Sequence, residues 1–145
     1  VSTNYFGHLE RKKIKVNNMK KLNIGLLAVI VGILFSCSGS DTYRGYWKAL
    51  DANGHKLEIV FEPKAFTIKD SLGQIKRFEY TQKSYEMSNS IETYGIALED
   101  GRAYKIHFPK PDDTSIGLIK DDNDKPLYTI ARQTYVTYDD IYKLN

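Results

Sequence analysis

The residue type with the most distinctive chemistry is cysteine, which occurs once in the 145 residues, as Cys37. A thiolate can attack an electrophile, bind a metal or enter a disulfide. A single cysteine excludes a disulfide within the chain, and a thiolate metal cluster needs a second sulfur. No histidine lies near Cys37 in the sequence to activate it as a nucleophile. We therefore expect a different use for this thiol.

Histidines and acidic residues form no recognisable catalytic set. His55 stands beside an expected turn, and His107 lies on the polar face of an expected strand. The acidic runs at 112–113 and 121–124 lack the glycine and the terminal glutamate of an EF-hand calcium loop. Neither a G-x-S-x-G motif nor a phosphate-binding loop occurs in the sequence. We predict a non-catalytic protein that uses neither a metal nor a cofactor.

Residues 19–36 have the order of features of a secretory signal. A positive start at 19–21 precedes the almost wholly apolar run 22–35, and small polar residues follow it. The alternative is a retained transmembrane helix, but the apolar run is shorter than the ~20 residues that span a bilayer. We predict export and removal of this signal, and we interpret residues 1–18 as an upstream start-site artefact.

The end of that segment, Leu34-Phe35-Ser36-Cys37, resembles the lipobox of bacterial lipoproteins. In that family the cysteine is acylated through a thioether and becomes the new N-terminus. Leu34 and Ser36 match the pattern, whereas Phe35 is bulkier than the usual residue. The resemblance implies that Cys37 carries a diacylglycerol and acyl anchor in a membrane, and that residues 37–42 form a lipidated tether.

The residues after Cys37 bear on location in the cell envelope. Ser38 stands where, in well-studied Gram-negative lipoproteins, an aspartate signals retention in the inner membrane. The resemblance therefore implies the outer membrane. Export to the cell surface is associated with an acidic run, and residues 38–42 contain only Asp41. We expect the domain to face the periplasm rather than the cell surface.

Charge argues against a nucleic-acid partner. The whole chain has a formal net charge of +3, but six of its 21 Lys and Arg residues and one of its 18 acids precede Cys37. The part from Cys37 onward is therefore slightly acidic. It lacks the excess of cations that neutralises phosphates in nucleic-acid binding.

From residue 43 onward, apolar and polar residues alternate in short runs separated by turn signals rich in Asp, Asn and Gly. This alternation is typical of strands with one buried face. The sequence predicts an all-β domain over 43–145, an antiparallel meander of eight or nine short strands. The meander is expected to close as a barrel or, alternatively, to stack as a β-sandwich. The expected strands are 43–50, 55–62, 65–69, 74–81, 84–88, 92–99, 102–108, 115–120 and 127–133.

Two local features qualify this pattern. Ile75 falls on the opposite face from Phe78 and Tyr80, which suggests a bulge or an edge position. The only expected helix is 138–144, where Thr137 and Asp140 can form a capping box.

Gly45-Tyr46-Trp47 on the first strand and Arg132 on the last form a further constellation. A guanidinium over an indole gains cation–π attraction and can donate hydrogen bonds to the chain ends. The pattern resembles that of lipocalins and related calycins, in particular the small lipocalin-like lipoproteins found in Bacteroidetes. The resemblance implies that Trp47 packs at the closed end of a barrel with Arg132 lying across it. The alternative is an ordinary core tryptophan and an exposed arginine.

Two functions follow from these expectations. The first is a lipid-anchored envelope protein that binds a small apolar ligand or a glycan in or on its barrel. The alternative is a protein–protein interaction module, such as an immunity protein, an enzyme inhibitor or an accessory of an envelope complex. Ten of the 11 tyrosines follow Cys37, and amphipathic tyrosines suit binding surfaces as well as small β cores.

Overall fold

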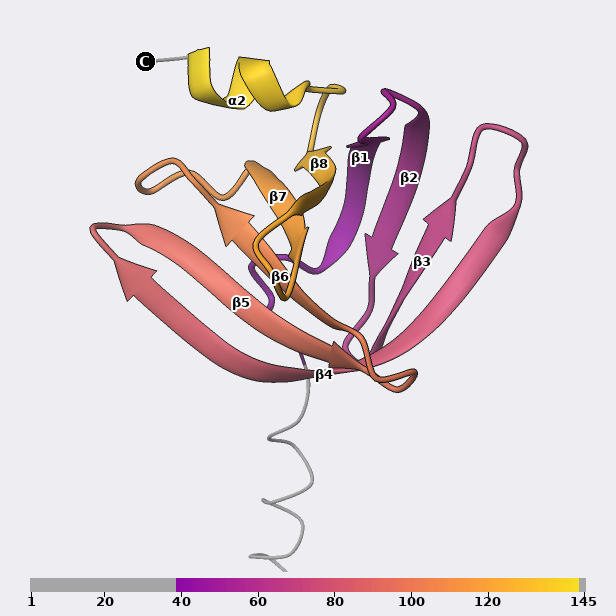
Figure 1. Cartoon of the computed structure of the whole chain (residues 1–145), viewed down its shortest axis with the longest axis horizontal. Helices are drawn as coiled ribbons and strands as arrows, with labels where there is room; N and C mark the ends of the chain where they lie inside the picture. Colours follow the sequence, from indigo (N-terminus) through magenta and orange to yellow (C-terminus); the bar gives the residue numbers. More distant parts are fainter. Residues whose placement is uncertain (1–38, 144–145) are drawn as a thin grey trace, which may run out of the picture. The chain divides into compact units, whose positions relative to one another are not determined.

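The structure, a computed structural model, describes residues 39–143. Its eight antiparallel strands follow one another in sequence order around a closed barrel, which β1 and β8 complete by pairing with each other (Figure 1). This confirms the expected all-β meander and its barrel form, and it excludes the sandwich. The elements are β1 (Gly45–Asp51), β2 (Lys56–Phe61), β3 (Ala65–Lys69), β4 (Ile75–Ser88), β5 (Ile91–Leu98), β6 (Ala103–Phe108), β7 (Ile116–Asp121), β8 (Pro126–Ala131) and α2 (Tyr138–Lys143).

The strand count is eight because the expected strands 74–81 and 84–88 are one continuous strand, β4. The pairing of β4 with β5 shifts register between Gln82 and Ser84, which marks a β-bulge. Ile75 is not in a bulge, because β4 pairs regularly with β3 from that residue onward. The expected edge position is confirmed, because β4 pairs with β5 only from Tyr80 onward. Ile75 points to the outside, where it is 65% exposed.

Alternate residues of all eight strands point inward and fill the barrel. Trp47, Ile59, Ile106 and Ile130 are fully buried, and aromatic rings pack along the interior. Each buried side chain of this size stabilises the fold by about 1.5–3 kcal/mol. The residues of this core are Tyr43, Trp47, Ala49, Ile59, Phe61, Phe66, Tyr80, Tyr94, Ile96, Leu98, Tyr104, Ile106, Phe108, Ile119 and Ile130.

The helix α2 covers part of the outer surface. Ile141 of α2 packs with Leu118 of β7 and Ala131 of β8 in a second, smaller apolar cluster. The expected capping box is confirmed. The Asp140 N–H donates to the Thr137 hydroxyl at 3.2 Å, and the Thr137 N–H donates to the Asp140 carboxylate at 3.1 Å.

The two ends of the barrel differ. In an up-and-down meander, the β1–β2, β3–β4, β5–β6 and β7–β8 turns share one end, which we name the open end. At the other end, the closed end, the segment 39–44 enters β1 beside the β2–β3 turn. A functional surface at one end is therefore separated from the chain entry by the length of the barrel.

Three turns of the open end are built in the same way. One carboxylate oxygen of Asp51, Asp70 and Asp121 accepts hydrogen bonds at 2.9 Å from the N–H groups two and four residues later. The fourth residue of each turn has a left-handed backbone: φ is 81° at Gly54, 81° at Gly73 and 62° at Asp124. These aspartates are turn formers, in keeping with their sequence context.

Candidate functional site

Cys37 and the residues of the expected lipobox, Leu34, Phe35 and Ser36, lie outside the described residues, as do residues 1–18 and the rest of the expected signal. The described part of the expected tether, residues 39–42, is hydrogen-bonded to the barrel. The Gly39 N–H donates to the Pro63 carbonyl at 2.7 Å, and the Ser40 N–H donates to the Gln82 side chain at 2.8 Å.

The structure brings Trp47 and Arg132 together at the closed end. The Arg132 guanidinium carbon lies 3.6 Å from the centre of the Trp47 ring. The indole N–H donates to the Tyr43 carbonyl at 2.8 Å, so the Trp47 ring is held at its edge as well as by the guanidinium over its face. Gly45 has φ of 92°, and a Cβ there would lie 3.4 Å from an Arg132 nitrogen. A side chain at this position would be strained by its backbone and would crowd the guanidinium.

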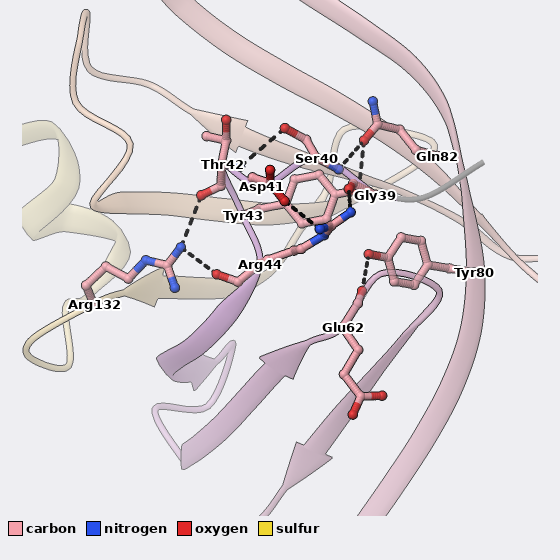
Figure 2. A network of polar contacts seen from close by, with 10 residues as sticks. All are labelled: Gly39, Ser40, Asp41, Thr42, Tyr43, Arg44, Glu62, Tyr80, Gln82 and Arg132. Carbon is pink, nitrogen blue, oxygen red and sulfur yellow. Dashed lines mark hydrogen bonds and ion pairs between the residues drawn. The ribbon is translucent and has the colours of Figure 1, made fainter. Parts of the chain in front are cut away.

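Arg132 also supplies hydrogen bonds where the pairing of β1 with β8 has ended. The last pair between β1 and β8 at this end is Lys48 with Ala131, so the carbonyls before Lys48 have no β8 partner. The Arg132 guanidinium donates to three of these carbonyls. Figure 2 shows the bonds to Thr42 at 3.1 Å and Arg44 at 2.9 Å, and the third, to Tyr46, is 3.0 Å long. Partial burial lowers the pKa of this guanidinium, but an arginine remains a cation.

Tyrosine hydroxyls complete the polar network of the closed end. Tyr43 donates to Gln82 at 2.9 Å, and Tyr80 donates to the Glu62 carbonyl at 2.7 Å. Tyr94 donates to the Glu92 carboxylate, and its hydroxyl oxygen is hydrogen-bonded to the Thr42 hydroxyl at 3.0 Å. Burial raises the pKa of the Tyr43 and Tyr80 phenols, which keeps them protonated as donors. Gln82, Tyr80 and Tyr94 were not singled out by sequence, because their partners other than Glu92 lie 18 to 52 residues away.

An arginine also lies across the mouth of the open end. The Arg102 guanidinium carbon is 5.0 Å from the centre of the Phe78 ring and 5.5 Å from that of Tyr104. One Arg102 nitrogen donates to the Tyr104 hydroxyl at 2.6 Å, and another pairs with Asp100 at 2.6 Å. Arg102 is thus placed over the aromatic rings at the top of the filled core.

A surface groove, which we name groove 1, lies where β1 and β8 diverge beyond their last pair, Asp51 with Tyr128. Its volume is about 570 Å³. Leu50, Ala52 and Leu127 contribute an apolar lining, and the start of α2 forms one wall. Tyr138, which lines that wall, is 48% exposed and lies against Tyr142, with 5.0 Å between ring centres.

Groove 2, of about 530 Å³, lies on the other side of the β1–β2 turn. It is lined by the start of β2, the β3–β4 turn and Tyr135. Leu72, in that turn, is 82% exposed. The Lys56 ammonium lies 5.1 Å from the centre of the Tyr135 ring. Grooves 1 and 2 therefore lie on either side of the β1–β2 turn, beside the exposed side chains of Tyr138 and Leu72.

The two histidines of the described chain have local partners. His55 pairs with Asp51 at 2.9 Å inside the β1–β2 turn, whose geometry that aspartate maintains. His107 lies in a polar groove on the outside of β5 to β7, with its Nδ1 at 2.8 Å from the Thr93 hydroxyl. Burial and then the nearby charge of Lys120 lower the pKa of the His107 imidazole.

Within residues 39–143, no group of three or more His, Cys, Asp or Glu side chains is placed to hold a metal ion. In the same range, none of the helices has the length and apolar character needed to cross a bilayer. Comparison with known proteins finds no matching family model, no matching curated protein and no matching solved structure, so the function is inferred from the geometry above.

Proposed function

We propose that this protein is a non-catalytic interaction module of the cell envelope, held in a membrane by a lipid on Cys37 and binding a protein partner at its open end. The observation that carries the proposal is the contrast between interior and surface. The barrel interior is filled by its own side chains, whereas grooves 1 and 2 lie open on the outside. An eight-stranded barrel can be packed solid in this way.

The presence of two open grooves at one end favours a protein over a small ligand. A small molecule typically occupies one concave site of ~300–1,000 Å³ that buries most of its surface. Here two open grooves flank the same turn, and Leu72, Tyr138 and Tyr142 are exposed around them. Groove 1 has an apolar lining, groove 2 a largely charged one, and exposed aromatic anchors beside such depressions are typical of protein–protein interfaces.

The position of the surface fits a lipid-anchored protein. The segment that follows Cys37 enters at the closed end, and grooves 1 and 2 lie at the open end. An anchor at Cys37 would hold the closed end near the bilayer and leave the open end accessible to a partner in the periplasm.

The anchor is tested by metabolic labelling with a clickable fatty acid in cells producing the wild type or Cys37→Ala. We expect label on the wild type alone. Equal labelling of both proteins would refute the anchor.

The partner surface is tested by photo-crosslinking in the same cells, with a photoreactive phenylalanine at Tyr138, at Leu72 or, as a control, at Glu86 on the outside of β4. We expect one protein crosslinked from positions 138 and 72 and absent from position 86. The purified partner should then bind at least tenfold more weakly to Tyr138→Asp than to wild type. If instead a glycan or apolar compound raises the melting temperature and no protein crosslinks, the small-ligand function replaces this one.

A further inference from the structure

We propose that the closed end of the barrel is a membrane-contacting surface, and that the β4–β5 hairpin touches the lipid headgroup region there through Tyr85 and Met87. The partner is a phospholipid bilayer. The inference rests on the proposed anchor at Cys37 and adds to it a defined orientation of the domain.

The chain that would connect the anchor to the barrel is fastened from Gly39 onward. Gly39 is bonded to the β2–β3 turn through the Pro63 carbonyl at 2.7 Å. One oxygen of the Gln82 side chain accepts from the Ser40 N–H at 2.8 Å and from the Tyr43 hydroxyl at 2.9 Å (Figure 2). The segment is therefore joined to both β4 and the β2–β3 turn.

Two further contacts remove freedom from this segment. The Thr42 hydroxyl is hydrogen-bonded to that of Tyr94 at 3.0 Å, and the Thr42 carbonyl accepts from Arg132 at 3.1 Å. Gly39 is packed so closely that a Cβ there would collide with the phenol oxygens of Tyr43 and Tyr80. Residues 39–43 are therefore held rigidly against the barrel and do not form a flexible linker. We name this segment the mount.

The sequence sets how far the barrel can be from the lipid. Only Ser38 separates Cys37 from Gly39. Two residues of extended chain reach at most about 7 Å. A lipid on Cys37 would therefore hold the closed end next to the headgroups, because the chain between Cys37 and Gly39 is too short to span a larger distance.

The same end carries an exposed apolar pair. Tyr85 is 50% exposed and Met87 is 57% exposed, on the part of β4 beyond its bulge. The Tyr85 ring lies 5.0 Å from that of Tyr94, whose hydroxyl is bonded to Thr42 of the mount. The Tyr94 ring thus connects Tyr85 to residues 39–43.

The chemistry of this pair fits a bilayer interface. Tyrosine is enriched at headgroup depth because its ring is apolar and its hydroxyl is polar. Methionine is flexible enough to pack against disordered acyl chains. By contrast, the exposed Leu72 lies at the open end, where the anchor cannot bring it to the membrane.

The test uses the full lipidated chain in vesicles of phosphatidylethanolamine and phosphatidylglycerol. An added cysteine carries an environment-sensitive fluorophore, at Met87→Cys, at Glu86→Cys on the opposite face of the same hairpin, or at Leu72→Cys. Lipids with a nitroxide near the headgroup serve as quenchers. We expect quenching at position 87 to exceed that at positions 86 and 72 at least threefold, with blue-shifted emission at 87 alone.

The outcomes separate this inference from the proposed function. If mass spectrometry shows lipid on Cys37, then equal quenching at the three positions, or stronger quenching at position 72, overturns the membrane-contacting surface alone. If the spectrum shows no lipid on Cys37, both the membrane-contacting surface and the proposed lipid anchor are overturned. All three substituted side chains are exposed, and thermal unfolding of each variant before labelling verifies the fold.

Discussion

At the scale of single residues, Arg132 provides hydrogen bonds to carbonyls that would otherwise pair with a longer β8 strand. Its five N–H donors in a rigid fork let one side chain satisfy three carbonyls while it stacks on the Trp47 indole. A lysine places one charge near the same carbonyls but cannot reproduce the fork or the stacking. The closed end therefore depends on this residue type and not only on positive charge.

We expect Arg132→Gln to lower the free energy of unfolding by about 3 kcal/mol, and Arg132→Lys by about half as much. Hydrogen bonds to a charged group contribute ~1.5–3 kcal/mol, and a desolvated cation–π contact up to ~2 kcal/mol. Urea unfolding measures both. Trp47 is the only tryptophan, so its emission reports the same site and should move to longer wavelength in Arg132→Gln. A change below about 0.5 kcal/mol in both variants would contradict this role.

His107 gives the protein an acid-sensitive component of stability. Burial, and then Lys120, lower the pKa of its imidazole below the ordinary 6.5. The unfolded chain therefore binds a proton at a pH where the folded chain does not. Stability falls as the pH falls below about 6.5, until the folded imidazole also protonates. Carboxyl groups of the unfolded chain titrate near 4 and contribute little above about pH 5.

The substitution His107→Gln should remove this component. We expect the free energy of unfolding of the wild type to drop more between about pH 7.5 and pH 5 than that of the variant. Urea unfolding at the two pH values checks it. Parallel losses in wild type and variant would assign the acid sensitivity to other groups.

At the scale of elements, the open-end turns show how one short motif positions several strands. Asp70 fixes the β3–β4 turn by accepting two N–H groups, and Gly73 supplies its left-handed residue. Asp124 adopts nearly the same conformation in the β7–β8 turn, so an aspartate or asparagine is tolerated there. A Cβ at Gly73 would meet no atom within 4 Å, so only backbone conformation opposes a side chain.

Gly73→Ala should therefore cost about 1 kcal/mol of unfolding free energy, and Gly73→Asn clearly less. Asparagine stabilises the left-handed conformation through its short polar side chain, whereas alanine does not. Thermal or urea unfolding of both variants measures the difference. Equal losses would show that the turn is held by something other than backbone conformation at this residue.

The same elements show what the sequence could and could not predict. The alternation of apolar and polar residues predicted the strands, because each strand has one buried face. The bulge in β4 interrupts that alternation, and a single strand with a bulge has the same pattern as two strands with a turn. Residues 39–42 have the composition of a linker, yet they are held by Gln82 and Tyr94. Contacts between distant residues of this kind leave no local signal.

At the scale of the whole molecule, the barrel closes around one core. The side chains that fill it come from every strand and from Tyr43 ahead of β1, and most of the large ones are aromatic. The sequence predicted the barrel but not whether it contains a cavity, because that depends on which large side chains meet in the interior. In the interior, the Trp47 ring packs against Phe108, and the Tyr43 ring packs against Phe61 and Tyr94. The ring centres of these pairs are 5.2–6.0 Å apart.

A single continuous core predicts cooperative unfolding of residues 39–143. Trp47 reports the closed end, and far-ultraviolet circular dichroism reports all eight strands. Because no strand has a core of its own, we expect both signals to change at the same urea concentration. The smaller cluster under α2 is separate, so Ile141→Ala should lower the common midpoint without splitting the two curves. If the Trp47 signal changed first, the closed end would unfold independently of the barrel, and its role as a fixed mount would fail with it.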